Sequence, residues 1–183
     1  MWFELGGIKV APQGALTFDQ TYAVEESAAV TRLAGGGAIK DTAWEKLAVT
    51  TTGTGRFPPG LAGLDYSQPL LMRCSAPREV SSASNVIVLP AARRVDADFV
   101  PQAYALLLPA GDDALTGPRW EPATIDSIVT NTATITPVAG ALQYQVWYWP
   151  ELTVFASRPQ VDHRGQPAGA ARPYSWTLEA REV

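Results

Sequence analysis

The chain has 183 residues, of which 46% are hydrophobic and 17% are charged. This composition indicates a folded chain, because disordered chains combine low hydrophobicity with high charge. The formal net charge is −4, with 18 acidic and 14 basic residues. Proteins that bind nucleic acid cluster Lys and Arg to neutralise phosphates, so we expect no specific nucleic-acid partner. The densest basic feature, Arg93 and Arg94, is followed by Asp96 and Asp98, which predicts a solvated or interfacial ion-pair site.

Breakers of regular structure are spread along the whole chain, which contains 15 glycines and 15 prolines. The short runs between them are rich in Val, Ile, Thr, Tyr and Trp, and this pattern predicts an all-β fold. In chain order, the expected strands are Leu5–Val10, Gly14–Phe18, Tyr22–Leu33, Ala38–Thr52, Leu70–Ser75, Val86–Leu89, Gln102–Leu108, Ala123–Val129, Thr132–Pro137, Gln143–Trp149, Leu152–Ala156 and Tyr174–Val183.

The third and fourth of these strands should form a long hairpin around the glycines at 35–37. The segment Ala38–Val49 also places apolar residues at a passable helical spacing. Its entry from three glycines and its exit into a Val-Thr-Thr-Thr run nevertheless favour a strand.

Two later segments alternate between apolar and polar residues, which is typical of half-buried strands. In Gln143–Trp149, Val146 lies with two tyrosines on one face, and in Tyr174–Val183 the apolar face includes Trp176 and Leu178. With the alternating positions of the hairpin, these patterns predict a core that contains Leu47, Val49, Val146, Trp176 and Leu178.

The segment Ser127–Pro150 carries no charge and is long enough to span a bilayer. Its many Thr, Asn and Gln residues make it too polar for that role, so we expect no membrane insertion. We interpret it as two uncharged strands of a buried sheet, joined at Pro137–Gly140. The N-terminal residues have neither a basic region nor a long apolar stretch, so no signal peptide is expected.

Residues that could carry catalysis or bind a metal are scarce. The chain has one histidine, His163, in a turn-like context, and one cysteine, Cys74, in a strand-like run that indicates a buried position. Zinc and copper sites need several such ligands, and a nucleophile needs a positioned base. Paired carboxylates for glycoside hydrolysis remain open, with Glu25, Glu26 and Glu121 as the nearest candidates. We expect no enzymatic activity and no cofactor or metal.

Tryptophans are the chain's second candidate binding group. Trp120, Trp147, Trp149 and Trp176 could form a platform on which sugar rings stack, although aromatic strand residues are more often core residues.

Two long loops, Gly53–Asp65 and Ser157–Pro173, are rich in Gly and Pro and carry arginines. Loops of this length are usually functional or disordered. We interpret each as an arm that reaches a neighbouring subunit, with a mobile hairpin tip as the alternative for the second loop. The expected intersubunit contacts are Arg56, Phe57, Pro58, Pro59, Arg158, His163, Arg164 and Arg172.

A resemblance connects these features to a family. The stretch from Val30 to about residue 75, with Gly-Gly-Gly-Ala-Ile-Lys-Asp-Thr-Ala-Trp-Glu-Lys at 35–46 and Gly-Thr-Gly-Arg-Phe-Pro-Pro-Gly at 53–60, resembles minor tail proteins at the distal end of the tail tube of long-tailed phages. The final strand also looks like the closing strand of such proteins. The resemblance implies a β-sandwich or split-barrel, tail-tube-like domain that forms a homo-oligomeric ring in the virion.

The resemblance further implies a distal-tail or baseplate ring or adaptor that joins the tail tube to the hub or fibres. A head–tail connector or tail-terminator protein is the alternative within this class, and a carbohydrate-binding module at the tail tip is the alternative outside it. Because the recognisable segments lie at the two ends, we expect residues 1–75 and 151–183 to form the ring-forming domain, with 76–150 as an inserted β subdomain. A single domain over residues 1–183 is the other possibility.

Overall fold

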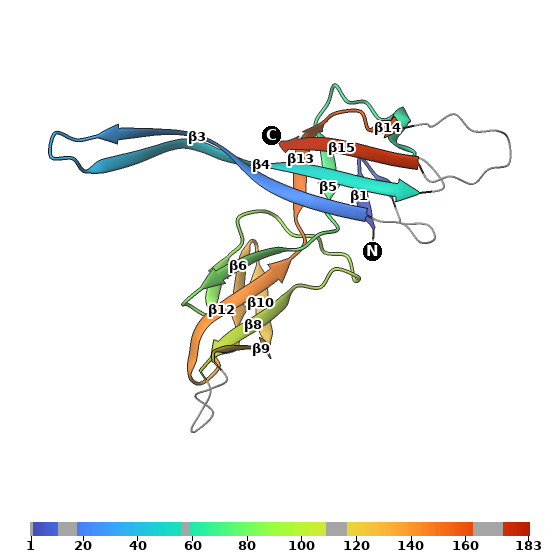
Figure 1. Cartoon of the computed structure of the whole chain (residues 1–183). Helices are drawn as coiled ribbons and strands as arrows, with labels where there is room; N and C mark the ends of the chain where they lie inside the picture. The colour runs from blue at the N-terminus through green and yellow to red at the C-terminus, as the bar shows by residue number, and fades with distance from the viewer. Residues whose placement is uncertain (1, 11–17, 56–58, 109–116, 163–173) are drawn as a thin grey trace. The chain divides into compact units, whose positions relative to one another are not determined.

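The computed structural model describes residues 2–10, 18–55, 59–108, 117–162 and 174–183 (Figure 1). The chain divides into two compact units, which we call unit 1 (Met1–Met72 with Thr153–Val183) and unit 2 (Arg73–Leu152). The division expected from the sequence had its boundaries after residues 75 and 150.

The all-β prediction is confirmed, since the described residues form three β-sheets and a single 3-10 turn, η1 (Leu61–Gly63). The strands of the sheet of unit 1 are β1 (Phe3–Leu5), β2 (Ile8–Val10), β3 (Phe18–Arg32), β4 (Ala38–Gly55), β5 (Leu70–Arg73), β13 (Glu151–Ala156), β14 (Gln160–Asp162) and β15 (Tyr174–Glu182). The strands of unit 2 are β6 (Arg78–Ser82), β7 (Val86–Val88), β8 (Gln102–Leu107), β9 (Arg119–Ala123), β10 (Ile125–Val129), β11 (Thr132–Ile135) and β12 (Ala141–Tyr148).

The sheet of unit 1 has the order β2-β1-β5-β13-β15-β4-β3, with β14 pairing beside β15. The boundaries between the units fall inside β5 and β13, which are neighbours in this sheet. The final strand, β15, is antiparallel to β13, β14 and β4. The C-terminal residues are therefore held in the middle of the sheet.

Every second side chain of β4 and β15 points to the same face of the sheet, and the core of unit 1 lies on that face. Leu47, Val49, Trp176 and Leu178 are all buried, which confirms the predicted core positions in this unit. The ring of Trp176 lies 6.0 Å from that of Phe3, centroid to centroid. Together these apolar side chains provide the burial that stabilises the sheet.

Gly53 of β4 is the direct cross-strand partner of Trp176. A Cβ atom at this position would lie 2.6 Å from Cζ2 of the indole. Only a residue without a side chain leaves room for the indole, which explains a glycine inside a strand, where glycine otherwise weakens pairing.

Unit 2 contains the sheets β6-β12-β8-β9 and β10-β11-β7. On β12 the predicted face of Tyr144, Val146 and Tyr148 is buried, and the tyrosine hydroxyl of Tyr144 accepts a hydrogen bond from Val138 N at 2.9 Å. The inner faces of the two sheets supply the core of the unit, including Ile135.

The uncharged segment does not form one buried sheet, and that expectation is wrong. The strands on either side of Pro137–Gly140 are β11 and β12, which belong to different sheets. The segment also begins in β10, where Ser127 and Val129 are exposed. A lack of charge therefore did not indicate burial here, because β10 is an edge strand whose Ser and Val side chains tolerate solvent.

Several strand boundaries also differ from the predictions. The expected strand Leu5–Val10 is interrupted by Gly6 and Gly7, which have positive φ and form a two-residue turn between β1 and β2. The expected strand Ala123–Val129 is split between β9 and β10, and β6 and β14 were not predicted. Except for Phe18, the expected strand Gly14–Phe18 lies outside the described residues.

The ion pair predicted to be solvated or interfacial is half-buried, with a buried cation and a partly exposed carboxylate. Arg94 is fully buried, and its Nε donates to Asp96 Oδ2 at 2.8 Å. Its Nη1 donates to the carbonyl of Cys74 at 2.9 Å, and its guanidinium lies 3.5 Å from the ring centre of Phe99. The carboxylate, the carbonyl and the ring replace part of the hydration that the buried cation loses. Cys74 is buried, as expected.

Candidate functional site

The most exposed part of unit 1 is the outer half of the hairpin formed by β3 and β4 (Figure 1). We call the segment Glu26–Glu45 the arm. The chain reverses at its tip, where Gly36 adopts a φ of 81° and Leu33 N donates to the carbonyl of Gly37 at 2.8 Å. Glycine suits this tip because positive φ costs it little.

Every residue of the arm is exposed. The reason is the register of β15, which pairs with β4 only from Ala48 to Gly55. Beyond Ala48, β4 has β3 as its sole neighbour among the described residues. The arm is therefore a two-stranded ribbon, and such ribbons are at best marginally stable in water by themselves.

The burial pattern changes where the arm begins. From Leu47 to Gly55, alternate residues of β4 are buried, whereas no residue from Ala38 to Glu45 is buried on either face. The register also shifts between Ser27 and Ala28, so that Trp44 lies opposite Ser27 and Thr42 opposite Ala28. A β-bulge of this kind increases the local twist of a ribbon and redirects its side chains.

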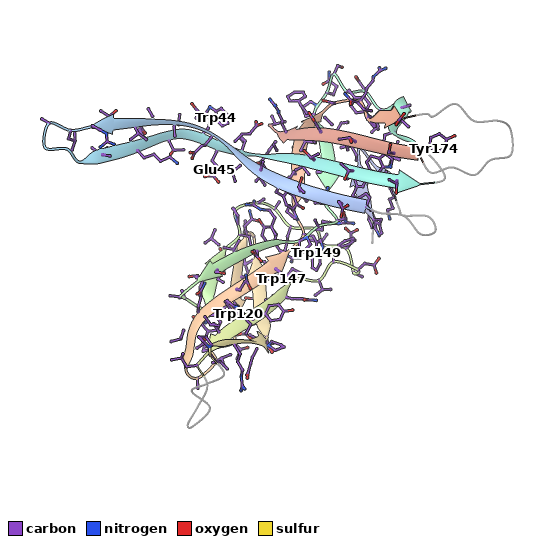
Figure 2. All side chains as sticks on the ribbon, viewed as in Figure 1. Trp44, Glu45, Trp120, Trp147, Trp149 and Tyr174 are labelled. Atoms are coloured by element: carbon purple, nitrogen blue, oxygen red, sulfur yellow. The ribbon has the colours of Figure 1, made fainter. Side chains whose placement is uncertain are left out.

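The arm carries several large apolar side chains in spite of its exposure. Val30 is 64% exposed and Trp44 is 49% exposed, and Leu33 and Ile39 are exposed near the tip. Figure 2 shows Trp44 on the arm, where the ribbon leaves the sheet. Exposed apolar patches mark surfaces that other molecules cover, and these four residues are the candidates for such a surface on the arm.

One ion pair lies within the arm. Lys40 Nζ lies 2.6 Å from Glu26 Oε2, and both side chains are substantially exposed. A surface pair of this kind contributes little to stability. The apolar residues, and not this ion pair, therefore distinguish the arm from an ordinary solvated hairpin.

The root of the arm is held by the C-terminal residues. Leu47 N donates to Glu182 Oε2 at 3.0 Å, and Lys46 Nζ donates to the carbonyl of Val183. Arg181 Nε lies 3.4 Å from Glu25 Oε1. These contacts fix the direction in which the ribbon leaves the sheet, although the ribbon itself has no cover.

The two loops that sequence reasoning favoured do approach each other in unit 1. The pocket between them has a volume of about 210 Å³ and is lined by Pro59–Ala62 from the first loop and by Arg158, Pro159 and Val161 from the second. The guanidinium of Arg158 lies 6.0 Å from the ring centre of Tyr66, whose hydroxyl donates to the carbonyl of Leu61 at 2.8 Å. Burial raises the pKa of Tyr66, and Arg158 partly offsets that rise.

Parts of both predicted loops are regular structure, which corrects their extent. Gly53–Gly55 belongs to β4, Leu61–Gly63 forms η1, and Gln160–Asp162 pairs with β15. Of the expected contact residues, Pro59 and Arg158 lie together at the pocket. The remaining ones lie outside the described residues: Arg56, Phe57, Pro58, His163, Arg164 and Arg172.

The four tryptophans of the possible sugar platform do not share one surface. Trp176 is buried in unit 1. Trp149 is half-buried, and its Nε1 donates to the carbonyl of Ser75 at 3.0 Å. Trp120 and Trp147 are exposed on the sheet β6-β12-β8-β9 (Figure 2).

The candidate carboxylates of a hydrolase each have a cation beside them. Glu26 pairs with Lys40 and Glu25 with Arg181 in unit 1, while Glu121 of unit 2 lies 2.8 Å from Arg119. In the described parts of the chain, no group of three or more His, Cys, Asp and Glu side chains is arranged to hold a metal ion.

No helix in the described ranges is long and apolar enough to cross a membrane. No protein-family model matches the chain, and no curated protein or solved structure matches it.

Proposed function

We propose that this chain is a structural, non-catalytic subunit of a phage tail, and that the arm joins it to neighbouring subunits. The arm is the observation that carries the proposal. Its residues Val30, Ile39 and Trp44 remain exposed on a ribbon that is marginally stable alone, so a neighbour that covers them would stabilise both partners.

We propose a ring of identical subunits as the assembly that the arm serves. In this arrangement the arm leaves unit 1 at one place and docks on a different part of the next copy. Such a heterologous contact repeats from subunit to subunit and closes when the rotation permits. The outer backbone edges of the ribbon add a second mode of contact, since an extended strand can pair with a neighbouring sheet.

The position in the particle follows from the resemblance. The stretch that resembles distal minor tail proteins begins at Val30, inside the arm, and continues through β4. We therefore propose a distal-tail or baseplate ring or adaptor in the virion, with further copies of the chain, the tail tube, the hub and the fibres as partners. A head–tail connector or tail-terminator ring would use the arm in the same way.

Imaging of the purified full-length chain tests this function. Negative-stain images and sedimentation should show closed rings or stacked tubes, and Trp44→Ala should lower the assembled fraction at least tenfold. Trp120→Ala, which truncates a similarly exposed tryptophan of unit 2, is the matched control and should assemble normally. A wild-type chain that stays monomeric at all concentrations, alone and with tail-tube protein, would refute the proposal.

A further inference from the structure

The outer face of the sheet β6-β12-β8-β9 in unit 2 brings exposed aromatic residues together. Tyr104 lies opposite Gln145, and Trp120 lies opposite Leu106. Because side chains alternate between faces, Trp147, Tyr104 and Trp120 all point away from the buried side of the sheet. The rings of Tyr104 and Trp147 are in contact, with centroids 5.6 Å apart. We call the surface of these three residues the aromatic face.

The three aromatic residues form a diagonal across three neighbouring strands, β12, β8 and β9. Each diagonal step combines one strand spacing with two residues along the strand, or roughly 8 Å. The Cα atoms of Trp147 and Trp120 are then about 16 Å apart on the untwisted lattice. A diagonal of this length suits an extended chain of several rings better than a single small ring.

Hydrogen-bonding groups surround the rings and are held in place. The hydroxyl of Tyr104 donates to Gln102 Oε1 at 2.9 Å, and Gln145 Nε2 donates to Glu79 Oε2 at 3.3 Å. Each amide has a second polar atom that these bonds do not use. The face therefore combines flat apolar rings with oriented neutral donors and acceptors.

A hollow of about 440 Å³ adjoins the middle of the diagonal. Gln102, Tyr104 and Pro122 line it, together with Val100 and Ile125. Ligand sites are usually concave and combine apolar walls with a few placed polar groups. The hollow supplies that shape beside Tyr104.

The charges of this face select among ligands that contain rings. Of the charged residues in these four strands, only Glu79 lies on the aromatic face, opposite Trp147, because Arg78, Arg119 and Glu121 pair with residues of the other face. Single-stranded nucleic acid also stacks on aromatic rings, but it requires a positively charged groove along its backbone. A neutral ligand fits this balance of charge, and a polyanion does not.

We propose that the aromatic face of unit 2 binds a neutral oligosaccharide. The apolar C–H faces of the sugar rings would lie on Trp147, Tyr104 and Trp120, and the sugar hydroxyls would bond to Gln102, Gln145 and Glu79. This function is additional to the assembly role of the arm, and it uses different residues in the other unit.

An array of neutral linear hexasaccharides of glucose, galactose, mannose and N-acetylglucosamine tests the site with the full-length chain. At least one should bind saturably by calorimetry, and Trp147→Ala and Tyr104→Ala should each weaken that binding at least tenfold. Tyr104→Phe keeps the ring and should weaken it less. Trp44→Ala, on the arm, should bind like the wild type.

Three results would overturn the inference. The first is the absence of binding by any of these neutral hexasaccharides at millimolar concentration. The second is tighter binding of an oligothymidylate or a sulfated hexasaccharide. The third is a fall in assembled mass for Trp147→Ala in a variant whose melting temperature is unchanged, because the face would then be a protein interface. Trp44→Ala fails in assembly alone if the arm proposal is correct, so the two proposals are tested separately.

Discussion

The backbone N–H of Leu47 donates a hydrogen bond to the carboxylate of Glu182 at 3.0 Å, at the point where the two-stranded arm leaves the sheet of unit 1. Leu47 is the first buried residue of β4 after the exposed arm, and Glu182 is the last residue of β15. The end of the C-terminal strand thus coincides with the start of the arm, and its final residues hold the arm's root.

Loss of this carboxylate should loosen the root. We expect Glu182→Ala to lower the free energy of unfolding by about 1–2 kcal/mol, since a hydrogen bond to a charged group of this kind is removed. Hydrogen exchange of the Leu47 amide should accelerate. Glu182→Gln keeps an acceptor oxygen and should have a smaller effect on both measurements. Equal exchange rates at Leu47 in all three proteins would contradict the clamp.

Gly53 and Trp176 should show strong energetic coupling. Gly53→Ala places a Cβ against the indole and should destabilise unit 1 by roughly 1–3 kcal/mol through overpacking. Trp176→Ala should cost about 3–5 kcal/mol as a large buried side chain is lost. In the double variant the alanine at 53 meets no indole. The double variant should therefore lose less stability than the sum of the losses of the two single variants. Denaturant unfolding of the wild type, the two single variants and the double variant measures this coupling. Simple additivity of the losses would show that the close approach of Gly53 and Trp176 does not limit the residue at position 53.

The ion pair of the buried Arg94 should matter more than an exposed one. Asp96→Ala leaves the buried guanidinium of Arg94 without this half-buried carboxylate, and the loss of this hydrogen bond to a buried donor should cost about 1–3 kcal/mol. Glu121→Ala removes the partner of the exposed Arg119 and should cost less than about 1 kcal/mol. Hydrogen exchange across residues 73–152 reports on this unit separately. Similar losses for the two variants would argue that Arg94 is hydrated.

Tyr148 should make the stability of unit 2 sensitive to alkaline pH. Its side chain is fully buried, and this burial raises the pKa of Tyr148 above the usual value of 10.0, with a partial offset from Arg78. The folded state therefore holds the phenolic proton more tightly than the unfolded state. The contribution of protonated Tyr148 to the free energy of unfolding is complete below pH 10, and it falls as pH rises from there through the raised pKa. Unfolding curves of Tyr148→Phe should lose less stability above pH 10 than those of the wild type; identical curves would contradict this.

Local alternation was sufficient to predict much of the fold. The pattern of Tyr174–Val183 identified Trp176 and Leu178 as core residues, and the glycines at 35–37 identified the turn of the long hairpin. Each of these features depends on residues that are close in sequence. The same reasoning could not assign β11 and β12 to different sheets, because the choice of partner strand depends on distant segments.

The candidate site depended on such distant information. The sequence predicts a hairpin, but it does not show where pairing of β4 with β15 ends. The register places Arg181 opposite Ala48, and this last pair shows where the arm begins. The burial pattern along β4 changes near that point, since Ala38–Glu45 lacks the alternating burial that starts at Leu47. The aromatic face likewise required the register of β12, β8 and β9, because the sequence pointed to Trp120 and Trp147 but not to Tyr104, and it could not show that the three share one face.

Replacement of the arm by a short turn tests the central claim most directly. Glu25 and Lys46 lie opposite each other in the register, so an Asn-Gly pair that joins them should close the shortened hairpin with a tight turn. We expect a folded monomer, with β15 still protected from hydrogen exchange, that forms no rings by sedimentation or negative-stain imaging. A shortened protein that assembles to the same mass as the wild type would contradict the account.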